Sequence, residues 1–159
     1  MHRAAGLTVL LSMLVASAAA QTAIFVEGGA LTAPGFSEFQ AGLRGSPATL
    51  NGTGLDFAAA TLPAHFSDGV VLVVADLDAS IHRPLSSAAA VAVRLGGTGA
   101  FGAGSGGGGA AFGINAGGGL IFSVGPRLLF RLDFTHRWFL SNGTTFGFNS
   151  VTFGIGVGG

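Results

Sequence analysis

The chain has 159 residues, of which 49% are hydrophobic, only 9% are charged and 29 are glycine. Its acidic and basic residues cancel, so no basic patch favours nucleic acid, and the absence of cysteine excludes disulfides, thiolate metal sites and a cysteine nucleophile. Beyond the first 20 residues, no apolar run reaches the ~20 residues that a membrane-spanning helix needs. A transmembrane β-barrel fits such a composition, because each of its strands needs only ~9–11 residues and only alternate residues face lipid.

The N-terminal segment MHRAAGLTVLLSMLVASAAAQ has an arginine near its start, a short apolar core and then small residues. That arrangement is typical of a secretory signal peptide and favours it over a membrane anchor, since the core is short. We expect a signal peptide over residues 1–20, with cleavage before Gln21. Residues 21–159 would then form one barrel domain.

Hydrophobic alternation predicts eight strands after the signal peptide, and helix signals are nearly absent there. The predicted strands cover residues 22–32, 36–46, 54–63, 69–83, 88–99, 110–124, 126–140 and 145–158. Eight is an even number, as single-chain bacterial barrels require, and it is the smallest size they use. The predicted fold class is therefore all-β, an eight-stranded antiparallel up-and-down transmembrane β-barrel.

The alternation is clearest in RLLFRLDFTHRWFL, residues 127–140, where the even-numbered positions are apolar apart from His136. The odd-numbered positions hold Arg127, Arg131, Asp133 and Arg137. A period of two indicates a strand with two unlike faces. The pattern is weakest over residues 22–31 and 55–62.

The connections suggest an orientation. With a periplasmic N-terminus, the tight links at 125–126 and 83–87 would be periplasmic turns. The glycine-rich stretch 97–109 and the segment 141–145 would then be outward loops. The stretch SPATLNGTG, residues 46–54, is too long for the short periplasmic turn expected there.

Charged side chains should face the lumen, because an arginine on the lipid face costs ~2–4 kcal/mol at the bilayer midplane. The strand phase assigns nine ionisable residues to the inner face: Glu38, Arg44, Asp76, Asp78, His82, Arg94, Arg131, Asp133 and Arg137. An eight-stranded barrel is just wide enough for side chains to fill, and buried charges need partners. We expect a structural ion-pair network there; the alternative is a narrow polar conduit or ligand site. His136, Trp138 and Phe139 suggest an interfacial aromatic belt.

Catalytic and cofactor motifs are weak. GTGAFG, residues 97–102, matches a dinucleotide-binding pattern, but more glycines follow it and no acidic residue appears until Asp133. Ser80 and His82 share the inner face and could support a hydrolase, although they more often belong to a polar filling. We expect no catalytic residue, metal site or cofactor.

The C-terminal half resembles the small outer-membrane β-barrel proteins, the porin-like family that includes the eight-stranded outer-membrane protein A-type barrels. The resemblance rests on FGINAGGGLIFSVGPRLLFRLDFTHRWF, residues 112–139, and on the closing SVTFGIGVGG, residues 150–159. Asn115, Pro126, Arg131 and Asp133 occupy the positions that this pattern expects. The aromatic residue with which such proteins commonly end is replaced by Val157-Gly158-Gly159, and Phe153 is the last aromatic.

This resemblance implies a protein of the cell outer membrane whose partners are outer-membrane lipid and the barrel-insertion machinery. The predicted function is non-enzymatic: a structural or surface-contact role, with a lumen filled by polar and charged side chains. The alternatives are a narrow porin-like channel or small-ligand-binding barrel, and a lipid-modifying barrel hydrolase using Ser80 and His82. The sequence identifies no surface partner and no nucleic-acid partner.

Overall fold

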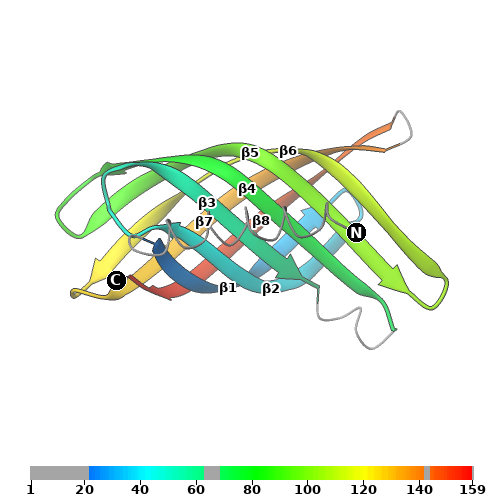
Figure 1. Cartoon of the computed structure of the whole chain (residues 1–159), viewed down its shortest axis with the longest axis horizontal. Helices are drawn as coiled ribbons and strands as arrows, with labels where there is room; N and C mark the ends of the chain where they lie inside the picture. Colours follow the sequence, from blue (N-terminus) through cyan, green and yellow to red (C-terminus); the bar gives the residue numbers. More distant parts are fainter. Residues whose placement is uncertain (1–21, 63–68, 142–143, 159) are drawn as a thin grey trace, which may run out of the picture.

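Eight antiparallel strands close into one barrel in the computed structural model, which describes residues 22–62, 69–141 and 144–158. The strands are β1 Thr22–Ala33, β2 Phe36–Pro47, β3 Gly52–Thr61, β4 Val71–Pro84, β5 Ala89–Gly104, β6 Gly107–Val124, β7 Leu128–Ser141 and β8 Thr144–Val157. Each strand pairs with its neighbours in the chain, and β1 pairs with β8 to close the ring (Figure 1). The predicted up-and-down barrel is confirmed, while the predicted signal peptide lies outside the described residues.

The barrel has two ends of different construction. At one end, on the left of Figure 1, lie the start of β1, the end of β8 and the turns that follow β2, β4 and β6. We call this the terminus end. The connections that follow β1, β3, β5 and β7 lie at the other end, which we call the hairpin end.

The glycine-rich stretch 97–109 is not the long outward loop that its composition suggested. It continues β5 to Gly104 and starts β6 at Gly107, so that the turn contains only Ser105 and Gly106. The ladder runs through it, for example from Gly102 to Gly109. Glycine carries no side chain to mark a face, yet its backbone amide and carbonyl pair as those of any other residue do.

The long connection 46–54 also differs from a simple turn. Strand β2 continues to Pro47, β3 begins at Gly52, and the four residues between them close the terminus end of the barrel. Ala48 and Leu50 pack against buried apolar side chains there, and His82 Nδ1 lies 2.9 Å from the Thr49 carbonyl oxygen. The extra residues therefore cover the lumen.

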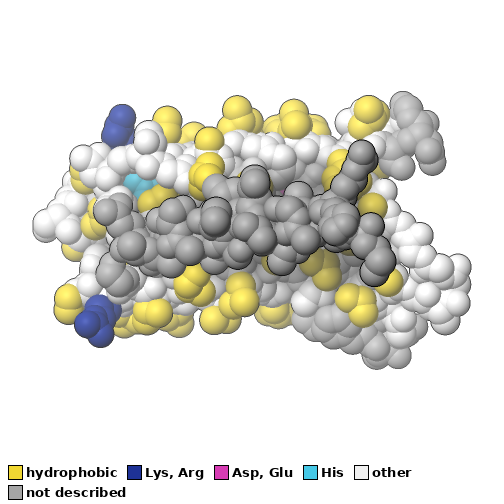
Figure 2. Space-filling view, viewed as in Figure 1, with side chains coloured by type: hydrophobic (Ala, Val, Ile, Leu, Met, Phe, Trp, Pro, Cys, Tyr) yellow, Lys and Arg dark blue, Asp and Glu magenta, His cyan; other side chains and the backbone are white. Residues whose placement is uncertain are grey.

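The outer wall of the barrel is apolar. Large outward side chains such as Leu95 and Ile114 are 63% and 60% exposed. In the described part of the chain, the charged residues outside the lumen are Arg83 and Arg127, and both lie at the terminus end. Figure 2 shows arginine only at that end of the visible described surface.

No helix among the described residues is long and apolar enough to cross a membrane.

Candidate functional site

The inner face of β4 shows three layers along the lumen. Leu72 and Val74 lie toward the hairpin end, Asp76 and Asp78 lie in the middle, and Ser80 and His82 lie toward the terminus end. Around the whole barrel, buried apolar clusters lie in both outer layers, next to Ser80 and His82 at the terminus end, and charged side chains occupy the middle. We call the charged layer the lumen network. It consists of Arg44, Arg94, Arg131, Arg137, Glu27, Asp56, Asp76, Asp78 and Asp133.

Arg131 of β7 uses all of its guanidinium nitrogens. Nη2 donates to Asp56 Oδ2 at 2.8 Å, Nη1 donates to Ser46 Oγ at 2.6 Å, and Nε donates to Asp133. Ser46 in turn donates to the second Asp56 oxygen at 2.9 Å. The Phe25 ring centroid lies 5.7 Å from the guanidinium carbon. This fully buried cation is therefore compensated by two carboxylates, Asp133 on its own strand and Asp56 on β3, as a stable buried charge requires.

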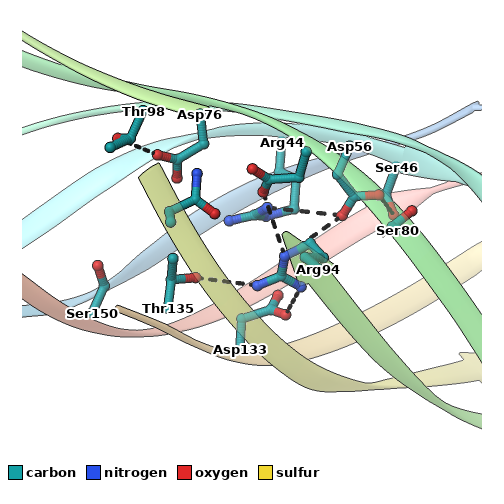
Figure 3. A network of polar contacts seen from close by, with 12 residues as sticks. Arg44, Ser46, Asp56, Asp76, Ser80, Arg94, Thr98, Asp133, Thr135 and Ser150 are labelled. Atoms are coloured by element: carbon teal, nitrogen blue, oxygen red, sulfur yellow. Dashed lines mark hydrogen bonds and ion pairs between the residues drawn. The ribbon is translucent and has the colours of Figure 1, made fainter. Parts of the chain in front are cut away.

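Arg94 and Arg44 connect further strands to the same centre. Arg94 of β5 donates to Asp133 and to Thr135 Oγ1, the latter at 3.2 Å (Figure 3). Its Nε lies 3.8 Å from Asp78 and 3.9 Å from Asp56, distances that allow Coulombic attraction but not a hydrogen bond. Arg44 donates to Glu27 at 2.7 Å and lies 3.8 Å from Asp56.

Arg137 and Asp76 form a separate pair closer to the hairpin end. The guanidinium donates through Nε to Oδ1 at 2.9 Å and through Nη2 to Oδ2 at 2.5 Å, the bidentate arrangement typical of strong Arg–carboxylate pairs. Nη1 donates to Ser150. Thr98 donates to Asp76 at 2.7 Å (Figure 3). The pair thus presents a neutral, hydrogen-bonded floor toward the hairpin end.

The structure places all nine predicted lumen residues on the inner face, but it does not bring all of them together. Arg44, Arg94, Arg131 and Asp133 meet at the centre, and Asp78 reaches it only through its 3.8 Å approach to Arg94. Arg137 and Asp76 pair with each other. His82 contacts the Thr49 carbonyl instead of a carboxylate. Glu38 lies nearer the hairpin end, opposite Leu31 in the register between β1 and β2.

Two acids of the network were missed in the sequence. Glu27 is 7% exposed and Asp56 is completely buried, and each accepts a hydrogen bond from an arginine. Both lie in the two segments whose alternation was weakest. For Asp56 a signal was present, because Leu55 and Phe57 flank it on the outward face, with 55% and 42% exposure. Glu27 was harder to recognise, since Phe25 shares its inner face and blurs the contrast.

The terminus end of the lumen is closed by apolar side chains. Ala23, Phe25, Ala92, Ile121 and Leu129 form a buried cluster, and the β2–β3 turn packs on it through Ala48 and Leu50. Together with the lumen network, this cluster fills the described lumen over much of its length.

The predicted aromatic belt needs one correction. His136 and Trp138 lie on the outward side of β7, with ring centroids 4.2 Å apart, and His136 Nδ1 is 2.6 Å from Asn149 Oδ1. Phe139, however, is completely buried; it stacks on Phe146 and packs at a tilt against Phe148, with centroids 5.3 and 5.5 Å away. It follows the inward phase of its strand and belongs to the apolar layer at the hairpin end.

The geometry offers little to catalysis. Ser80 donates to the Gly54 carbonyl at 3.3 Å and is 1% exposed, while the neighbouring His82 is completely buried under the β2–β3 turn. The GTGAFG stretch lies inside β5, with no helix after it. Within the described ranges, no group of three or more His, Asp or Glu side chains could hold a metal ion.

A closed eight-stranded barrel with an apolar outer wall and a charged interior has the architecture that is typical of small membrane β-barrels. Solved structures with the same fold include the N-terminal β-barrel domain of OprF from Pseudomonas aeruginosa, with a TM-score of 0.63 and 15% identity, covering 87% of this chain and 98% of that one. Neisserial surface protein A matches with a TM-score of 0.55 and 13% identity over 86% of this chain and 94% of that one.

The attachment invasion locus protein Ail of Yersinia pestis matches with a TM-score of 0.54 and 14% identity, covering 87% of this chain and 95% of that one. These three structural neighbours are eight-stranded outer-membrane barrels of the outer-membrane protein A type. The fold of this chain is therefore the one that such barrels share. No family model and no curated protein sequence matches the chain.

Proposed function

We propose that this chain is a bacterial outer-membrane β-barrel protein with a structural or surface-contact role and a lumen closed by its own side chains. One observation carries the proposal: in the described part of the chain, every charged residue lies either inside the barrel or at its terminus end. An outer wall without charge suits the hydrocarbon layer of a membrane. A protein that exposed this much apolar area to water would aggregate. The likeness of fold to outer-membrane barrels supports the location.

The proposed partners are outer-membrane lipid and the machinery that inserts barrels into that membrane. With the terminus end in the periplasm, Arg83 and Arg127 would lie where the periplasmic face of the outer membrane meets water. Arginines there keep their charge in water while the strands cross the apolar layer. The hairpin end would then face outward.

The first test is heat-modifiability. The chain without residues 1–20, folded in detergent micelles, should run at different mobilities on a denaturing gel before and after boiling, with a β-rich circular dichroism spectrum. A chain that stays soluble without detergent and shows no mobility shift would contradict the membrane assignment. Fractionation of the bacterial envelope tests the location, and we expect the protein in the outer-membrane fraction.

A narrow channel is the main competing function. It requires a continuous polar path, whereas the lumen network is enclosed by apolar layers and closed by the β2–β3 turn. The folded protein in a planar bilayer should therefore show no stable single-channel conductance. Steady openings of reproducible size would replace the closed-lumen proposal with a channel.

The lipid-modifying hydrolase is less well supported, because Ser80 and His82 are buried and each is directed to a backbone carbonyl. We expect the Ser80→Ala, His82→Ala double variant to leave envelope lipids unchanged. A change in the acylation pattern of envelope lipids would support the hydrolase hypothesis.

The proposed surface contact would be made at the hairpin end, where the turns after β1 and β5 contain only two residues each. A structure of Ail holds the heparin analogue sucrose octasulfate. We do not extend that ligand to this chain, because among the described residues both arginines outside the lumen lie at the opposite end.

A further inference from the structure

A cavity opens into the lumen at the hairpin end, on the right of Figure 1. Its volume is about 610 Å³, and Leu31, Phe36, Leu62, Leu72, Val74 and Phe148 are among the residues that line it. We call it the apolar cup. Seven of the eight strands or their ends contribute to its lining, all but β7, so it is a feature of the closed barrel and not of a single hairpin.

The cup differs chemically from the layer beneath it. On the inner face of each strand, the next inward residue toward the hairpin end is apolar: Val74 next to Asp76, Ala100 next to Thr98, and Phe148 next to Ser150. The polar groups of this floor already bond to one another through Arg137 and Asp76. A water molecule in the cup would therefore find few partners, and apolar cavities of only ~150 Å³ already bind benzene in preference to water. The natural occupant is hydrocarbon.

Charge restricts the occupant further. Asp76 lies below the cup and is neutralised by Arg137, and the described lumen as a whole holds more carboxylates than guanidinium groups. No described arginine lies at the hairpin end. An anionic head group would meet a negative field without a cation to bind, so an uncharged chain is favoured.

We propose that the apolar cup binds an uncharged hydrocarbon chain, such as the tail of a fatty alcohol or of a neutral lipid. The chain enters tail first and its polar end stays at the hairpin end. Ligand pockets of ~300–1,000 Å³ are the usual size for small molecules, and the cup falls within that range. This inference goes beyond the proposed function, because a closed structural barrel needs no ligand.

Photoaffinity labelling provides the test. The folded barrel in phosphatidylcholine nanodiscs is irradiated with a long-chain alcohol that carries a diazirine near its tail, and the labelled positions are mapped by mass spectrometry. We expect saturable labelling at Leu72 and Phe148 that unlabelled alcohol competes away, besides non-saturable labelling of lipid-facing positions such as Leu95 and Ile114. The corresponding ionised carboxylic acid should compete about tenfold less well.

Two neighbouring residues of β5 offer a matched pair of variants. Gly102 lines the cup, and a Cβ added there would meet only Leu72 Cδ1 at 3.8 Å. Gly102→Leu should therefore fill the cup and abolish saturable labelling. Ala103→Leu adds bulk to the opposite, outward face and should leave the labelling unchanged. If Gly102→Leu does not fold, Gly109→Leu replaces it, because a Cβ at Gly109 meets nothing within 4 Å.

The source of the chain is decided by a second probe, a phosphatidylcholine with the diazirine in its acyl chain built into the nanodisc. Labelling of the cup by this lipid supports the proposal with the membrane as source. Labelling by the added alcohol alone supports it with a free amphiphile as source. Labelling of the cup by neither probe in folded protein, or undiminished labelling in the cup-filled variant, overturns the site. Equal competition by the carboxylate overturns its preference for an uncharged chain.

Discussion

Arg131 of β7 and Asp56 of β3 are joined across the lumen at 2.8 Å, although β7 and β3 lie on opposite sides of the eight-stranded ring. The pair therefore ties the two halves of the barrel wall through its interior. Backbone ladders hold only neighbouring strands. The lumen network adds the cross-barrel connections that a ladder cannot provide.

Breaking this pair should be costly. Replacing Asp56 with Asn leaves Arg131 buried with a neutral neighbour, and we expect the free energy of unfolding to fall by about 3 kcal/mol or more. Arg131→Met combined with Asp56→Leu should cost less than the sum of the single changes, since it removes both charges. Urea unfolding of the barrel in lipid vesicles measures Asp56→Asn and the four proteins of the cycle, which are the unchanged barrel, Arg131→Met, Asp56→Leu and the double variant. Strict additivity would show that the pair is not coupled.

Asp133 and Asp78 should respond differently to the same substitution. Asp133 accepts hydrogen bonds from both Arg94 and Arg131, whereas Asp78 comes no closer to Arg94 Nε than 3.8 Å. Asp133→Asn should destabilise the barrel by about 3 kcal/mol, because two arginines lose a partner. Asp78→Asn should cost less than about 1 kcal/mol. The same unfolding assay compares them, and an equal loss would refute the assignment of Asp78 to the edge of the network.

The depth of the outer wall in the membrane can be tested with two leucines of nearly equal exposure. Leu95 is 63% exposed on the outward face of β5, and Leu85 is 64% exposed in the turn at the terminus end. Leu95→Arg should lower stability in a bilayer by ~2–4 kcal/mol, whereas Leu85→Arg should change it by less than ~1 kcal/mol. Folding yield into liposomes gives an independent readout. Equal tolerance of both arginines would argue that β5 does not face lipid.

Two glycines of β6 should differ sharply in their tolerance of alanine. A Cβ on Gly113 would lie 1.8 Å from the Trp138 carbonyl oxygen of the neighbouring strand, while a Cβ on Gly109 would meet nothing within 4 Å. Gly113→Ala must displace backbone and should cost about 1–3 kcal/mol or prevent folding. Gly109→Ala should be neutral. Thermal unfolding followed by gel mobility distinguishes the two.

The sequence alone was sufficient to predict the number of strands and the face on which most charged side chains lie. Strand alternation is a local property, and the cost of a charge in lipid decides the face of each residue without reference to distant strands. That is why Arg44, Asp76, Arg94 and Arg131 could be assigned to the lumen from their phase. The barrel class followed from eight strands and an apolar composition.

The tertiary structure alone decided which charges meet, where the barrel is closed and where it is hollow. Asp56 and Arg131 are 75 residues apart, and only the stagger of the closed sheet brings them together. The turn after β2 closes the lumen, and this role is visible only in the folded barrel, where Leu50 packs on the buried cluster at the terminus end. Glycines at 97–109 gave no phase to read, because a residue without a side chain marks neither face of a strand. The apolar cup is likewise invisible in any one segment, since its lining is assembled from side chains of many strands.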